Sequence, residues 1–118
     1  MSFLEFSTAT AKQRRDARVQ ARLASDFLKA MSHEGRLLIL CLLVDGEASV
    51  SEIEVKLDMP QAAVSQQLMR LRLDGLVEAR RDGRNICYAL ARPEVTELIT
   101  TLNDLFCKTE RRARRGRN

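Results

Sequence analysis

The chain lacks several features that mark common classes of protein. It has no tryptophan, and aromatic residues make up only 4% of its 118 residues, so a platform of stacking aromatics for single-stranded nucleic acid is not expected. No apolar run reaches the length of a membrane span, and the first ten residues hold too few apolar side chains for a secretory signal. We therefore expect a protein of the cytoplasm with no membrane partner.

Histidine and cysteine are also scarce. The only histidine is His33, and the three cysteines, Cys41, Cys87 and Cys107, are odd in number and far apart, which argues against a disulfide framework. The sequence has no Gly-rich phosphate loop and no nucleophile elbow, and its one histidine offers no catalytic constellation. These absences argue against an enzyme.

What is present is a soluble, basic chain. Apolar residues make up 45% and charged residues 31%, as in a single globular domain spanning residues 1–118. The net charge is +4, and basic residues cluster in KQRRDAR (12–18), RRDGR (80–84) and KTERRARRGRN (108–118). Clustered arginine favours a polyanionic partner. At the two basic termini, disordered and solvated tails are an equal alternative.

Apolar residues recur at helical spacing in the first third of the chain. A helix is predicted from about Asp16 to Met31, and Ser32 is suited to cap a second helix. That second helix covers the run RLLILCLLVDG, residues 36–46, because its leucine-rich composition favours a buried helix over a strand. The residues that recur at helical spacing in the first helix are Val19, Leu23, Phe27, Leu28 and Met31.

The next two helices follow the pattern of a helix–turn–helix. Ser49 and Glu52 fit a capping box at the start of a short helix. Pro60 suits the first turn of the following helix, and Asp74-Gly75 is predicted to end that helix. Its buried stripe is predicted to consist of Val64, Leu68 and Leu71.

A basic hairpin and a last helix complete the predicted fold. The runs LVEARR (76–81) and RNICYAL (84–90) are joined through Asp82-Gly83, which predicts a hairpin with a type I′ turn. A helix is expected from about Pro93 toward Arg112, with Val95, Leu98, Leu102, Leu105 and Phe106 on one side. The predicted fold is mainly α with a β-hairpin wing, a winged helix–turn–helix of about five helices.

The outward face of the helix after Pro60 has the composition of a DNA-reading surface. Small residues let a helix approach base edges in the major groove, and amides and arginine read those edges. The candidate residues are Gln61, Ala62, Ala63, Ser65, Gln66 and Arg70. At the hairpin tip, Arg80, Arg81 and Arg84 are expected to meet phosphates or the minor groove. An ordinary exposed helix is the alternative, but the short helix and the basic hairpin beside it favour DNA binding.

Three segments resemble, in order and spacing, the ArsR (ArsR/SmtB) family of bacterial repressors. They are SHEGRLLILCLL, SVSEIEVKLDMPQAAVSQQLMRLRLDGLV and RRDGRNICYAL, and the resemblance covers residues 20–107. It implies a homodimer built from the first and last helices, which binds an inverted repeat in double-stranded DNA and leaves it when an inducer is sensed. Pro60 departs from the family pattern, in which serine often starts the recognition helix.

The metal sites of that family are not matched. Many relatives carry Glu-x-Cys-Val-Cys-Asp-Leu on the third helix, whereas EASVSEI places Ser49 and Ser51 at the cysteine positions, and neutral hydroxyls are poor ligands for soft metals. Other relatives bind zinc between last helices through histidines that this last helix lacks, and His33 is expected to be a helix-end residue. We expect neither a metal nor a cofactor. A metal sensor with a non-standard thiol site remains an alternative.

Cys41 and Cys107 resemble the thiols of the persulfide- and redox-responsive family members, in which the second and last helices become covalently linked. The resemblance implies a dithiol switch that senses reactive sulfur species; a peroxide or disulfide sensor is the alternative, as is an architectural protein with no inducer. Lys108 and Arg111 favour the thiolate of Cys107, so we expect Cys107 to attack first and Cys41 to resolve from a drier site. Cys87 is expected to be incidental.

Overall fold

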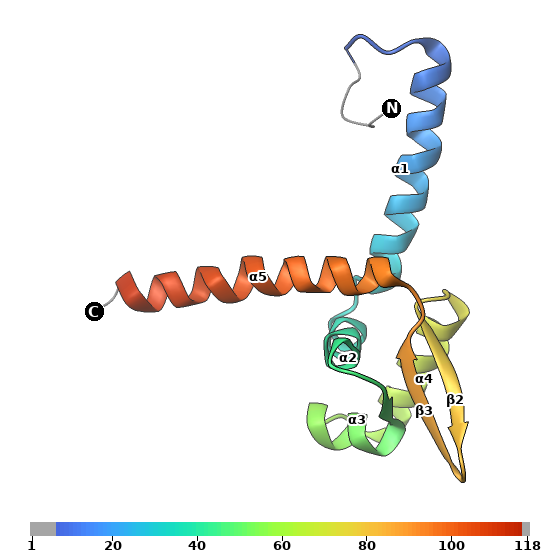
Figure 1. Ribbon diagram of the computed structural model, residues 1–118, viewed down its shortest axis with the longest axis vertical. Coiled ribbons are helices and arrows are strands. Elements are labelled where there is room, and N and C mark those ends of the chain that lie inside the picture. Colours follow the sequence, from blue (N-terminus) through green and yellow to red (C-terminus); the bar gives the residue numbers. More distant parts are fainter. Residues whose placement is uncertain (1–6, 117–118) are drawn as a thin grey trace. The chain divides into compact units, whose positions relative to one another are not determined.

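The structure is a computed structural model that describes residues 7–116, with side chains described for residues 7–106. The chain divides into two compact units, which meet in sequence between His33 and Glu34. The first unit contains α1, and the second contains the helix–turn–helix, the sheet and the last helix (Figure 1). None of the helices in the described part of the chain is long and apolar enough to cross a membrane.

Helix α1 spans Ala11–Met31 and begins earlier than the predicted Asp16. Its start is fixed by a capping box in which Gln13 N donates to Thr10 Oγ1 at 3.2 Å and Thr10 N donates to Gln13 Oε1 at 2.9 Å. The prediction that Ser32 caps the second helix is wrong. Ser32 ends α1 instead, because its hydroxyl donates back to the carbonyl of Lys29 at 2.9 Å.

Helix α2 spans Glu34–Val44, so the dense apolar run is a helix, as its leucine content predicted. Ile39, Leu40 and Leu43 are buried on its inner side. Cys41 lies on the outer side and is exposed. The expectation of a drier site for Cys41 is therefore wrong, since an apolar helix still has one face that its own domain leaves uncovered.

Helices α3 (Val50–Leu57) and α4 (Gln61–Leu73) form the predicted helix–turn–helix. The Ser49–Glu52 capping box at the start of α3 is confirmed. Asp58 ends α3 in the left-handed conformation, with φ 52°. Pro60 caps α4 rather than occupying its first turn. Its extended conformation suits a cap, because an N-cap residue is non-helical.

A three-stranded antiparallel sheet in the order β1-β3-β2 is formed by strands on both sides of the helix–turn–helix in the chain. Strands β2 (Val77–Asp82) and β3 (Asn85–Leu90) form the predicted hairpin, and the two-residue strand β1 (Ala48–Ser49), which was not predicted, pairs with β3. The predicted type I′ turn is wrong. Gly83 has φ +63°, but Arg84 does not have positive φ, and a side chain makes the left-handed region costly there. Positive φ at the first central residue alone is typical of a type II′ turn.

Helix α5 spans Pro93–Gly116, beyond the predicted end at Arg112. Val95 and Ile99 are buried, and Ile99 was not among the residues predicted to form one side of the helix. Leu105 and Phe106, which belong to that predicted side, are 58% and 71% exposed. In the part of α5 whose side chains the structure describes, the buried residues therefore lie in the first two turns.

The core of the second unit joins every layer of the fold. Side chains from α2, α3, α4 and α5 and the residue before β2 are almost completely buried: Ile39, Leu40, Ile53, Val64, Leu68, Leu71, Leu76 and Val95. These contacts hold α4 beside α2 and α3, while the tip of the β2–β3 hairpin extends beyond the helices (Figure 1). One face of α4 and the hairpin tip consequently remain at the surface.

Candidate nucleic-acid interface

The face of α4 opposite its buried stripe carries most of the candidate DNA-reading residues. Val64, Leu68 and Leu71 are at most 1% exposed and fix the rotation of the helix. This rotation exposes Gln61, Ala62, Ser65, Gln66, Met69 and Arg70, and leaves Ala63 half-buried. Small side chains dominate the first two turns, so the backbone there can approach a partner closely.

The charges on α4 suit an anionic partner. No acidic side chain lies in its first turn, and Arg70 and Arg72 lie in its last turn. Arg70 Nε donates to Asp74 Oδ2 at 3.2 Å, one helical turn further along the chain. Exposed ion pairs at this spacing are weak, and this one engages Nε only, which leaves the terminal amino groups of Arg70 available to bind another group.

At the wing, the structure separates Arg80 from the other two candidate arginines. Arg80 Nε donates to Glu47 Oε2 at 3.2 Å, and Arg80 Nη2 donates to Glu47 Oε1. Because Glu47 precedes β1 and the strand order is β1-β3-β2, this bidentate pair spans the sheet from edge to edge. Arg81 and Arg84 are exposed. No sequence signal indicated the pair, whose members lie 33 residues apart.

The Glu47–Arg80 pair keeps both groups charged. The hydrogen bonds from Arg80 hold the pKa of the Glu47 carboxyl below its usual value. The same hydrogen bonds raise the pKa of the Arg80 guanidinium. Arg80 therefore carries a charge that Glu47 already balances, and we expect it to brace the wing more than to bind a phosphate.

Alanine at Arg84 is expected to weaken binding to duplex DNA more than alanine at Arg80. The magnitude of the slope of log K against log salt concentration falls by about 0.9 for each phosphate contact removed. Because the charge of Arg80 is already balanced by Glu47, Arg80 is not expected to make such a contact. Fluorescence anisotropy titrations at several salt concentrations measure both slopes. Equal reductions for Arg80→Ala and Arg84→Ala would contradict the bracing role.

The three cysteines lie on three different elements. Cys41 is exposed on α2, and Cys87 is half-buried on β3, in register with Ser49 and Arg80. The backbone of Cys107 belongs to α5, but its side chain lies outside the described residues, as do the side chains of the basic segment 108–118. Helix α2 packs against both α4 and α5, so it connects the helix that bears Cys107 with the candidate DNA-reading helix.

The described residues offer no ready metal site. No group of three or more His, Cys, Asp or Glu side chains among them is placed to hold a metal ion. Ser49 uses its hydroxyl to cap α3 by accepting from Glu52 N, and Ser51 is exposed. The two positions at which the resemblance places cysteines in metal-sensing proteins are therefore a helix cap and a surface residue.

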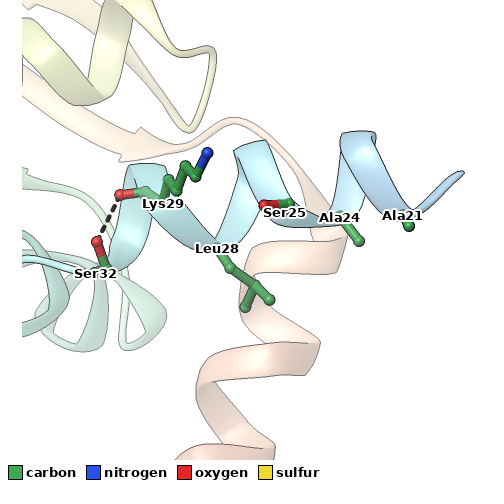
Figure 2. Close-up of a pocket in the computed structure, with 6 residues that line it drawn as sticks. All are labelled: Ala21, Ala24, Ser25, Leu28, Lys29 and Ser32. Carbon is green, nitrogen blue, oxygen red and sulfur yellow. Dashed lines mark hydrogen bonds between the residues drawn. The ribbon is translucent and has the colours of Figure 1, made fainter. Parts of the chain in front are cut away.

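Helix α1 presents exposed apolar and small side chains. Val19, Leu23 and Leu28 are each more than half exposed. A shallow hollow of about 420 Å³ is lined by Ala21, Ala24, Ser25, Leu28, Lys29 and Ser32; Figure 2 shows Leu28 one turn from Ala24, with Ser32 bonded to the Lys29 carbonyl. Exposed apolar patches of this kind commonly mark protein–protein contacts.

Comparisons with known proteins agree with this geometry. Residues 33–79 match the family described as bacterial regulatory protein, arsR family. The transcriptional activator HlyU of Vibrio cholerae is 46% identical over 81 residues, which are 69% of this chain and 75% of HlyU. The biofilm growth-associated repressor of Xylella fastidiosa (strain Temecula1) is 37% identical over 107 residues, covering 91% of this chain and 94% of the repressor.

Solved structures give the same result for the fold. Reduced HlyU from V. cholerae has a TM-score of 0.75 at 41% identity, over 79% of this chain and 98% of that one. The homodimeric winged helix–turn–helix DNA-binding domain of Mb0332 from Mycobacterium bovis has a TM-score of 0.66 at 30% identity, over 88% and 93% of the two chains. The fold is therefore a winged helix–turn–helix, as predicted.

Proposed function

Because the chain belongs to the ArsR family of bacterial regulatory proteins, we propose that it is a dimeric, cytoplasmic repressor that binds an inverted-repeat operator and leaves it when its thiols are modified. The chain is a DNA-binding transcriptional regulator and not an enzyme. The observation that carries the proposal is the outward face of α4, where Gln66 and Arg70 lie exposed on a helix whose small first-turn residues permit close approach.

Repression is proposed rather than activation because of the relative that spans most of this chain. The X. fastidiosa protein, which matches over 91% of the chain, is named a repressor, whereas the match to the activator HlyU covers 69%. A dimer that occupies an operator blocks access to the DNA by its presence alone. Repression therefore needs no contact beyond the DNA interface.

A homodimer is supported by exposed apolar surface on α1 and α5. Val19, Leu23 and Leu28 of α1 and Phe106 of α5 are each more than half exposed, and a second copy of the chain would remove this surface from water. The Mb0332 domain, which has the same fold, is described as homodimeric. A two-fold dimer presents two copies of α4 and so reads two half-sites related by inverted symmetry.

Control by thiols is supported by the positions of Cys41 and Cys107. Cys41 is exposed, so a dissolved reagent can reach it, and its helix packs against both α4 and α5. One solved relative is described as reduced HlyU, so the redox state of that protein is part of its description. Modification of α2 and α5 would act on the scaffold that sets the separation of the two α4 helices.

The chemistry of the switch has two balanced routes. An oxidant that accepts two electrons and two protons joins the two sulfurs directly, which requires Cα atoms within about 7 Å. Alternatively, a polysulfide transfers one sulfur atom to a thiol and leaves as a shorter polysulfide. A second polysulfide molecule then accepts two electrons and two protons from the persulfide and the second thiol, its own S–S bond breaks to give two shorter hydrosulfide species, and a three-sulfur bridge forms. We propose reactive sulfur species as the inducer, because the longer bridge relaxes the distance requirement.

Selection of DNA from a random-sequence pool tests the proposed function. The reduced protein is expected to enrich an inverted repeat whose half-site centres lie about one helical turn, 10–10.5 base pairs, or a multiple of it apart. Sequencing of the selected pool gives the symmetry and the spacing. A pool without enrichment, or with a single unsymmetrical site, would contradict a dimer that reads two half-sites.

A further inference from the structure

Beside the exposed face of α4 lies a polar groove that extends onto α2. The groove has a volume of about 350 Å³ and is lined by Arg36, Gln66, Gln67, Met69, Arg70 and Leu73. A water molecule occupies roughly 30 Å³ in the liquid, so the groove has room for a phosphate group and the sugar beside it. Only Arg36 comes from α2, and it was not among the residues that the sequence indicated.

A hydrogen bond between side chains holds Arg36 against the DNA-reading helix. Arg36 Nε donates to Gln67 Oε1 at 2.8 Å, and both residues are half-buried. This bond leaves the two terminal amino groups of Arg36 and the side-chain amino group of Gln67 as donors. No acidic side chain is paired with Arg36 in the described part of the chain, so its charge is not balanced there as that of Arg80 is.

The lining of the groove selects the kind of group that fits it. Arg36 and Arg70 supply positive charge, and no carboxylate lines the groove. Asp74, the nearest acid along α4, has one oxygen engaged by Arg70 Nε. Guanidinium groups pair well with phosphate oxygens, while Met69 and Leu73 offer apolar contact to a sugar ring. A phosphodiester satisfies these demands better than a neutral ligand.

The position of the groove specifies which phosphodiester it receives. A helix in the major groove, which is about 12 Å wide, has a phosphate backbone along each side. Gln67 lies on one flank of α4, between the buried stripe and the outward face, and Arg36 lies beside that flank. When the outward face of α4 meets base edges, a cation at this flank therefore meets the adjoining backbone.

We propose that Arg36 binds a backbone phosphate of the operator in this groove, so that the DNA interface extends from α4 onto α2. This inference rests on the proposed function, because it requires α4 to enter the major groove. Gln67 positions Arg36 for the contact. Arg36 and Cys41 both belong to α2, so the helix that makes the phosphate contact also carries one of the two thiols proposed to sense the inducer.

The test is the salt dependence of operator binding by wild-type protein and three variants. Arg36→Met removes the charge from both protomers of a dimer and is expected to lower the magnitude of the salt slope by about 1.8, or 0.9 for each phosphate contact. Arg36→Lys keeps the charge and is expected to keep the slope. Arg72→Met is the matched control, because Arg72 is an exposed arginine on α4 outside the groove.

Two outcomes would overturn the inference. One is an Arg36→Met protein that loses affinity but keeps the wild-type slope, since a purely structural role moves the affinity alone. The other is an equal loss of slope in Arg72→Met. If circular dichroism shows that the Arg36→Met protein is unfolded, Arg36→Gln is measured in its place, and the same reduced slope is expected. Failure of the wild-type protein to prefer operator over random DNA would instead count against the proposed function.

Discussion

Serine at Cys41 or at Cys107 is expected to leave operator binding intact and to abolish its release by polysulfide. A serine hydroxyl is nearly the size of a thiol but cannot form a sulfur bridge, so each variant keeps the DNA-binding conformation and loses the switch. Couplings between two sites in a protein typically change affinity by about 5- to 150-fold. Polysulfide should therefore weaken wild-type binding within that range and leave both variants unchanged in anisotropy titrations.

Cys87→Ser supplies the matched control for this result. Cys87 is half-buried on β3, whereas the two thiols assigned to the switch belong to α2 and α5, so its variant should release DNA as the wild-type protein does. A Cys87 variant that loses the response while the other two variants keep it would show that the switch is assigned to the wrong thiols. Intact-mass spectrometry of the released protein then shows whether the bridge has gained sulfur atoms.

Alanine at Gln66 or Arg70 is expected to reduce specific binding far more than non-specific binding. A bidentate contact to a base is worth about 1–3 kcal/mol of discrimination, and each 1.4 kcal/mol corresponds to a factor of ten. The ratio of operator to random-DNA affinity should therefore fall between about fivefold and 150-fold for each half-site, and by the square of that factor for a dimer that carries the substitution in both protomers. Competition titrations with unlabelled random duplex measure that ratio directly.

The control for the base-reading residues is Arg72→Ala on the same helix. Arg72 lies outside the cluster around Gln66 and Arg70, so its loss should leave the ratio of operator to random-DNA affinity unchanged. Parallel losses on operator and random DNA for Gln66→Ala and Arg70→Ala would mean that these residues contact only the backbone. Specificity would then have to come from the shape of the DNA.

The helices could be predicted because each one carries its own local signal. Ser49 and Glu52 cap α3 across one turn, and the spacing of Val64, Leu68 and Leu71 fixes the rotation of α4. Strand β1 was missed because two residues are too few to show an alternating pattern. Its pairing with β3 joins segments about forty residues apart in the chain, which local patterns do not report.

In the candidate site, too, local features could be predicted from the sequence and long-range contacts could not. The outward residues of α4 follow from helical geometry, so exposure of Gln66 and Arg70 could be predicted. The partners of Arg36 and Arg80 could not, since Gln67 and Glu47 lie 31 and 33 residues away from them in the chain. The exposure of Cys41 was missed for a related reason: an apolar segment indicates burial, but only packing decides which side of the helix is covered.

Amide NMR of the labelled protein with its selected operator tests whether α4 and the wing form the DNA interface. Large chemical-shift changes are expected along Gln61–Arg70, including the side-chain amide of Gln66, and at Arg81 and Arg84 in the hairpin. Residues on the exposed face of α1 should shift little. Changes concentrated on α1, with the resonances of α4 unchanged, would show that the DNA interface does not lie on α4 and the wing.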